Sequence, residues 1–185
     1  MPDLPDALVG DWIQSVVRRY ERQLIAYASR HLNGDLDRAR DVVQDTFLKL
    51  WQADRDQIDD HLAQWLYTVC RNRALDVRRK ESRMAPLDST PPPATTSSPH
   101  DDAVLAVTPG ERLSEQLLNA LTDRQQEVVR LKFQGGLSYR EIAAVMDTTV
   151  NNVGVLLHHA IRSIRRTLDD GATRASVSTT GRETR

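Results

Sequence analysis

The segment Gly136–Arg166, GLSYREIAAVMDTTVNNVGVLLHHAIRSIRR, decides the fold of the C-terminal half of this chain. Ser138 and Glu141 have the spacing of a capping box, which predicts that a helix begins at Ser138. A short turn follows, and then a second helix with apolar residues at three-and-four spacing. These apolar residues are Val153, Leu156, Leu157, Ala160, Ile161, Ile164 and Leu168. Two short helices joined by a tight turn are typical of a helix-turn-helix, whose second helix lies in the DNA major groove.

The front of this second helix carries no basic residue, because residues 151–156 read NNVGVL. The whole chain has a formal net charge of −1, so no global positive field attracts it to nucleic acid. DNA affinity must therefore come from local patches or from a partner. On this segment alone, a plain helical bundle without a DNA role is the alternative. His158 and His159 are neighbours that point in different directions, which argues against a shared metal site.

The domain boundaries follow from changes in composition. Four helices are predicted in a second domain over 109–168, at 111–120, 123–134, 138–146 and 151–168. Residues 84–108 are rich in Pro, Ser and Thr and poor in apolar mass, which predicts a flexible linker. Residues 169–185 are predicted to form a disordered tail. A first helical domain is expected over residues 1–83.

Three amphipathic helices are predicted in this first domain. The first runs from about Val9 to Ala28 and stops at Asn33-Gly34, the second starts near Asp35, and the third includes Leu62, Trp65 and Cys70. No period-two alternation is long enough for a strand. The fold class is therefore all-α, with two small helical domains joined by a flexible linker, the second of four helices and containing the helix-turn-helix.

Composition excludes several classes of protein. Cys70 is the single cysteine, so no internal disulfide framework exists and a reducing cytoplasm is expected. No signal peptide and no membrane-spanning apolar run is present, so membrane insertion is not expected. The histidines lack ligand spacing and no glycine-rich phosphate loop occurs, which argues against a metal, a cofactor and catalysis.

Three motifs of the first domain narrow the function. DVVQDTFLKLW at 41–51, WLYTVCRN at 65–72 and DVRR at 76–79, followed by the helix-turn-helix, resemble the bacterial extracytoplasmic-function (ECF) sigma factors. The resemblance covers about residues 9–83 and 111–168. It implies a non-enzymatic subunit that binds core RNA polymerase, recognises the −10 and −35 elements of promoter DNA and helps to initiate transcription. The alternative is a stand-alone helix-turn-helix regulator that binds duplex DNA without polymerase.

The resemblance also implies roles for individual residues. Polymerase binding is assigned to the exposed side of the second helix, at Asp41, Gln44, Asp45, Lys49 and Trp51. Recognition and melting of the −10 element is assigned to Tyr67, Arg71, Asn72, Arg78 and Arg79. Recognition of the −35 element is assigned to Ser138, Tyr139, Arg140, Asn151, Asn152 and His158.

Two of these assignments have a physical basis as well. Asparagine suits bidentate contact with adenine in the major groove, which favours Asn151 and Asn152. Tyr67 and Trp65 could stack on extruded bases, and Tyr67 is preferred because Trp65 lies on the apolar stripe. The basic end of the third helix would follow DNA phosphates, although a solvated helix end explains it as well.

The chain departs from the family at Arg38 and Arg40, where relatives usually carry carboxylates. Two cations there would reverse the local charge and could weaken docking. One hypothesis is that phosphorylation restores negative charge, with Thr46 as a site. The alternative is that the arginines point to water or that the polymerase differs locally. Two regulatory partners are thus left open, an anti-sigma factor and a Ser/Thr kinase.

Overall fold

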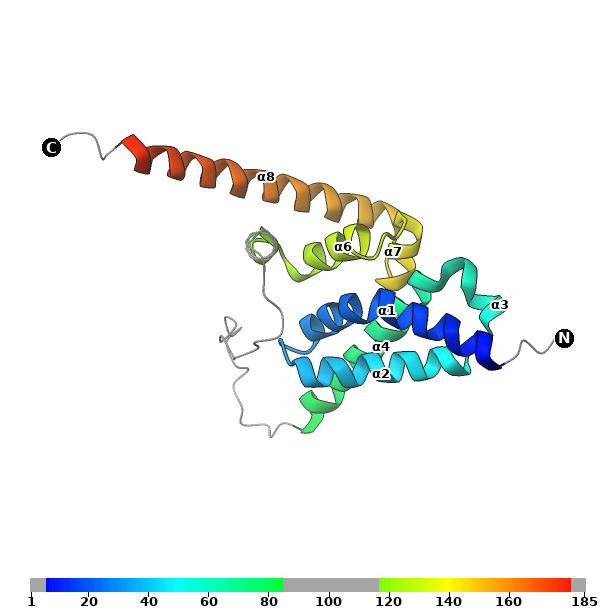
Figure 1. Ribbon diagram of the computed structural model, residues 1–185. Helices are drawn as coiled ribbons and strands as arrows, with labels where there is room; N and C mark the ends of the chain where they lie inside the picture. Colours follow the sequence, from blue (N-terminus) through cyan, green and yellow to red (C-terminus); the bar gives the residue numbers. More distant parts are fainter. Residues whose placement is uncertain (1–5, 85–116, 181–185) are drawn as a thin grey trace. The chain divides into compact units, whose positions relative to one another are not determined.

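The computed structural model of the chain describes residues 6–84 and 117–180 (Figure 1). The contacts divide the chain into two compact units, and all regular elements of the described residues are helices. These elements are α1 (Asp6–His31), α2 (Leu36–Gln52), α3 (Arg55–Ile58), the 3-10 helix η1 (Asp59–His61), α4 (Leu62–Met84), α6 (Asp123–Phe133), α7 (Tyr139–Val145) and α8 (Val150–Thr180). The predicted all-α class is confirmed.

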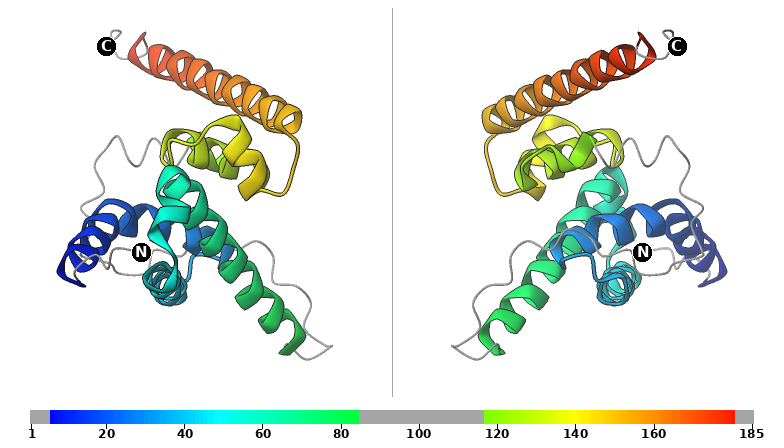
Figure 2. Two further views of the ribbon diagram at one scale, coloured as in Figure 1. Left: turned by 90° about the vertical axis from the view of Figure 1, so that its right-hand side faces the viewer. Right: turned by 90° about the vertical axis from the view of Figure 1, so that its left-hand side faces the viewer.

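Helices α1, α2 and α4 pack against one another to form the N-terminal unit. Figure 2 looks along α2 and shows α4 crossing it obliquely. The core is made by the apolar stripes of these helices, and Leu24, Leu50 and Leu66 are among its fully buried side chains. Burial of such side chains supplies most of the stability of the unit, because short helices are marginal alone in water.

The connections of this unit are set by local residue chemistry. The predicted stop after α1 is confirmed, because Asn33 and Gly34 adopt φ values of 58° and 85°, in the left-handed region that ends helices. Asp35 then caps α2 by accepting a hydrogen bond from the Arg38 backbone N–H at 3.0 Å. Residues 53–61, between α2 and α4, are rich in aspartate, a composition typical of a loop. The structure instead has α3 and η1 there, because Asp54 caps a short helical turn.

The C-terminal unit contains two capping boxes, one of them the box predicted at Ser138. Thr122 and Gln125 cap α6 reciprocally, and Ser138 and Glu141 cap α7 in the same way. Each box satisfies backbone N–H groups that the first turn of a helix leaves without partners. The start of the helix-turn-helix at Ser138 is therefore fixed as the sequence predicted.

The limits of this unit differ in part from the prediction. Most of the predicted helix 111–120 and the predicted linker after Met84 lie outside the described residues, and residues 117–119 are helical. At the other end α8 continues to Thr180, whereas the sequence predicted an end at residue 168 and a disordered tail after it. No proline and only Gly171 interrupt this segment, so an established helix can propagate through it. Among the helices of the described residues, none has the length and apolar content that crossing a bilayer requires.

Candidate functional site

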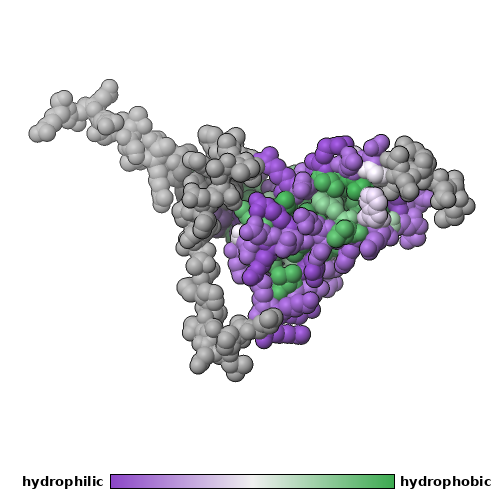
Figure 3. All heavy atoms as spheres, turned by 60° about the horizontal axis from the view of Figure 1, so that its bottom comes forward, coloured by the Kyte–Doolittle hydropathy of each residue, from purple (hydrophilic) through white to green (hydrophobic). Residues whose placement is uncertain are grey.

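The outward side of α2 carries an apolar pair within a polar stripe. Asp41, Gln44, Leu48 and Trp51 follow at three-and-four spacing and are all exposed, so they share one side of the helix. Leu48 and Trp51 keep 61% and 62% of their surface open to solvent. Apolar side chains are visible among hydrophilic ones on the face that Figure 3 turns toward the viewer. Large exposed apolar side chains that adjoin one another mark interaction surfaces.

Leu48 was not among the predicted site residues, although its sequence position gave a signal. It lies on the polar side of an otherwise regular amphipathic helix, one turn before Trp51. An apolar residue that breaks the pattern on the solvent side is a candidate for a contact with a partner. We therefore call Asp41, Gln44, Leu48 and Trp51 the α2 face.

The other two predicted polymerase-binding residues differ from each other. Lys49 is exposed beside the α2 face. Asp45 is half-buried and accepts a hydrogen bond from Arg73 Nε of α4 at 2.7 Å. Asp45 therefore holds α2 and α4 together, and its carboxylate is already engaged within the chain.

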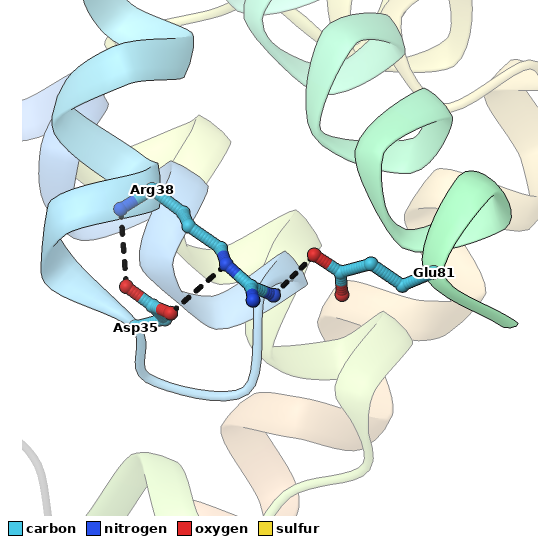
Figure 4. A network of polar contacts seen from close by, with 3 residues as sticks. All are labelled: Asp35, Arg38 and Glu81. Atoms are coloured by element: carbon cyan, nitrogen blue, oxygen red, sulfur yellow. Dashed lines mark hydrogen bonds and ion pairs between the residues drawn. The ribbon is translucent and has the colours of Figure 1, made fainter. Parts of the chain in front are cut away.

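Both arginines that depart from the family pattern are paired within the chain, and Figure 4 shows the contacts of Arg38. Arg38 lies between two carboxylates, with Asp35 Oδ2 3.2 Å from its Nε and the Glu81 carboxylate of α4 on its guanidinium. Arg40 donates to Asp37 at 2.8 Å. Neighbouring carboxylates therefore offset part of the positive charge of both arginines, and the effect of this charge on docking stays a prediction.

The Arg38–Glu81 pair should contribute little to folding stability. Both side chains are about half exposed, and exposed ion pairs contribute at most about 1 kcal/mol. In a double-mutant cycle of Arg38→Ala and Glu81→Ala, we expect a coupling energy of about 0.5 kcal/mol that falls as salt is added. Urea unfolding of the four proteins at low and high salt measures it. A coupling above about 2 kcal/mol would contradict the exposed-pair interpretation.

The C-terminal half of α4 presents a mixed polar surface. Asn72, Arg79 and Arg83 are exposed and lie on one side of the helix, at spacings of seven and four residues. Arg79 is partly offset by Asp76 at 3.4 Å. Arg78 is also exposed, and Arg71 is half-buried. This surface can donate hydrogen bonds to phosphates and presents one amide for contact with a base.

Tyr67 does not belong to this surface. Its side chain is 1% exposed, its ring packs edge-on against Tyr27, and its hydroxyl donates to Gln23 Oε1 at 3.5 Å. The prediction that Tyr67 stacks on a base is therefore wrong for this conformation, because its ring belongs to the core. Trp65, which was assigned to the core, is only half-buried. The predicted apolar stripe is confirmed at Leu66 and Cys70, which are fully buried, but it extends toward Tyr67 and not toward Trp65.

The second helix of the helix-turn-helix is the start of α8. Asn151, Val155 and His158 are exposed and lie on one side of it, at spacings of four and three residues. Asn152 is half-buried, and its Nδ2 donates to Thr148 Oγ1 at 2.8 Å. Its side chain thus supports the turn before α8. Of the two predicted asparagines, Asn151 is the one that is open to a ligand.

A shallow groove lies between the start of α8 and Tyr139 of α7. Tyr139, Val150, Asn151, Gly154, Val155 and His158 line it, together with His159. Lys132 Nζ lies 5.5 Å from the centre of the Tyr139 ring, a cation–π distance that helps to hold this ring in place. Ser138 and Arg140 are exposed beside Tyr139. Four predicted −35 residues, Tyr139, Asn151, His158 and the neighbouring Arg140, are thus brought together.

Comparison with known proteins identifies the family of this chain. Residues 16–84 match sigma-70 region 2, and residues 113–164 match sigma-70 region 4. The ECF RNA polymerase sigma factor SigL of Mycobacterium tuberculosis is 33% identical over 153 residues, which cover 80% of this chain and 84% of SigL. The chain belongs to the ECF sigma factors.

Further relatives agree with this sigma factor in length and fold. RNA polymerase sigma factor YlaC of Bacillus subtilis is 25% identical over 162 residues, which cover 85% of this chain and 92% of YlaC. The sigma factor RpoE of Bartonella quintana, solved with the anti-sigma factor NepR, has the same fold, with a TM-score of 0.56 and 23% identity over 86% of this chain and 97% of that one. The protein is thus a non-enzymatic transcription initiation factor, and the predicted function is confirmed.

Other groups in this sigma factor have structural explanations. Burial raises the pKa of the Cys70 thiol to about 12, so the thiol stays protonated and unreactive at neutral pH. No group of three or more potential ligand residues that could hold a metal ion occurs within residues 6–84 and 117–180 as described.

Proposed function

We propose that this sigma factor docks on core RNA polymerase through the α2 face. The observation that carries the proposal is the exposure of Leu48 and Trp51 side by side on an otherwise polar helix side. Desolvated aromatic side chains dominate the binding energy of protein interfaces, while polar neighbours set register and exclude wrong partners. Asp41, Gln44 and Lys49 would supply these polar contacts, and Asp45 would act indirectly by holding α2 against α4.

Residues 1–83 would also recognise and melt the −10 element, through the outward surface of α4. Asn72 is the exposed amide of this surface, and Arg71, Arg78 and Arg79 are its cations. Cations follow phosphates without reading sequence, whereas an amide can bond to an extruded base. Residues 109–168 would recognise the −35 element with the start of α8. Residues 84–108 would tether the two domains.

The cellular context is part of the same proposal. Binding to core polymerase would place this sigma factor in the bacterial cytoplasm. An anti-sigma factor is the regulatory partner we favour, since a protein that covers Leu48 and Trp51 would compete directly with polymerase. Control by a kinase at Thr46 is not supported, because this side chain is fully buried.

Reconstituted transcription tests the proposal. The full chain and bacterial core polymerase, given a pool of promoter fragments with random −10 and −35 elements, should initiate at a discrete subset. In that subset, Asn72→Ala should reduce promoter opening, read by permanganate reactivity of unpaired thymines, by about tenfold or more, with duplex binding changed much less. Lys80→Ala, which changes an exposed residue of α4 that is not among the proposed DNA contacts, serves as the control. Equal opening by the Asn72→Ala protein would contradict the assignment of α4.

A further inference from the structure

We infer that the groove at the start of α8 selects A·T base pairs at the −35 element through the methyl groups of thymine. The inference rests on the proposed role of α8 in promoter recognition and names the chemistry by which it selects. Val150 and Val155 are 48% and 47% exposed, although both lie in the part of the helix-turn-helix that faces a major groove. Exposed valines there have a matching partner in DNA, because the thymine C5-methyl is the apolar group of the major groove.

The position of Asn151 fits the same base pair. Asn151 and Val155 are four residues apart on one side of α8, so their side chains are neighbours one helical turn apart. An A·T pair presents the N6 and N7 groups of adenine and the methyl group of thymine along the same groove edge. Asn151 can bond to the adenine while Val155 contacts the thymine of this pair or of an adjacent one. No cation contributes to selection at these positions.

Gly154 gives the groove its depth. It is a glycine inside a helix, where alanine would be more favourable by intrinsic propensity. An alanine would fit at this position, because its Cβ would lie at an ordinary van der Waals distance of 3.9 Å from Tyr139 Cε2. The glycine therefore keeps the groove between α8 and Tyr139 open, at a cost in helix stability.

Thymine-to-deoxyuridine replacement tests the inference, because it removes only the methyl group. Full chain and core polymerase first select −35 elements from a randomised pool, and each selected thymine is then replaced singly. For the unmodified protein we expect initiation to fall about fourfold at one or two thymines, as for loss of one buried methyl group. The Val155→Ala protein should lose this sensitivity, with less than a twofold effect. Leu168→Ala, which removes an exposed apolar side chain outside the groove, should keep it.

Gly154→Ala provides a second readout that does not depend on a loss of folding. The substitution should raise the melting temperature by about 4 °C, because alanine favours the helix. It should at the same time weaken selection at the −35 element by about threefold or more, because it fills the groove. A variant that is more stable and selects equally well would overturn the role of the groove.

The remaining outcomes separate the inference from the proposed function. Promoter-specific initiation without enriched A·T pairs at −35, or without any deoxyuridine effect, would overturn the thymine-methyl inference and leave the function intact. Initiation that ignores the −35 sequence altogether would overturn both. Enrichment of A·T pairs whose methyl sensitivity disappears only in Val155→Ala would support both.

Discussion

Replacement of Trp51 by alanine is expected to weaken binding of core RNA polymerase by about 30-fold. Trp51 is 62% exposed, and its neighbour Leu48 is similarly open, so the pair offers an apolar surface that the proposed docking would bury. Buried tryptophans at interface centres typically contribute about 2 kcal/mol or more, which corresponds to this change in affinity. The full chain, labelled at its N-terminus and titrated with core polymerase in the absence of DNA, gives the dissociation constant directly.

Urea unfolding and a control variant distinguish the loss of a contact with polymerase from a loss of folding. Because Trp51 makes little contact with the core, Trp51→Ala should unfold at the same urea concentration as the unmodified protein, within about 0.5 kcal/mol. Leu168→Ala removes a comparably exposed apolar side chain from α8 and should bind core polymerase normally. Leu48→Ala should weaken binding as well, by a smaller factor because the side chain is smaller. Unchanged affinity in both α2 variants would show that polymerase docks elsewhere.

Replacement of Thr46 by glutamate is expected to destabilise the N-terminal unit by about 3–5 kcal/mol. The Thr46 side chain is 0% exposed, and its hydroxyl donates to the Val42 carbonyl oxygen at 2.8 Å. Cys70 lies within hydrogen-bond contact on α4, so the surroundings of this side chain are buried and uncharged there. A charge buried without a partner costs several kcal/mol unless the group is neutralised or the helix moves outward.

Thr46→Val is the matched control for this substitution. It keeps the shape of the side chain and removes only the hydroxyl, so a loss of about 1 kcal/mol is expected. Urea unfolding of both variants, followed by far-UV circular dichroism, measures the difference. A Thr46→Glu protein that unfolds normally and binds core polymerase more tightly would restore the phosphorylation hypothesis, which the burial of this residue otherwise removes.

Local signals in the sequence were sufficient for most helices, but not for α3, η1 and the continuation of α8 beyond residue 168, and not for contacts between helices. Apolar spacing and the capping residues at Asp35, Thr122 and Ser138 depend on neighbours along the chain, and the structure confirms them. The partner of Arg38 lies 43 residues away on α4, so no local pattern could reveal that its charge is offset. The same holds for Asp45, whose carboxylate is held by Arg73.

Among the site residues, too, local spacing predicted some positions, and contacts between helices decided others. Asn151 and the exposed residues of α2 could be predicted, since helical spacing alone separates the two sides of a helix. The burial of Tyr67 could not be predicted, because Tyr67 and Trp65 lie on opposite edges of one apolar stripe. A small rotation of the helix buries one of them and exposes the other. Only the contacts with Tyr27 and Gln23 decide that Tyr67 is the buried one. The inferred selection of thymine by α8 rests on the exposure of Val150 and Val155, which the structure supplies.

The ion pairs between α2 and α4 have a mechanical consequence. Arg73–Asp45 and Arg38–Glu81 cross the same helix pair at two separate levels, so sliding or rotation of one helix along the other breaks at least one of them. Helix α2 carries the surface proposed for core polymerase, and α4 carries the surface proposed for the −10 element. The packing of α2 against α4 resists relative movement more than these partly exposed ion pairs do, so the two helices are expected to move together. A displacement of α2 by the polymerase would therefore also displace α4 and strain the promoter DNA bound to it.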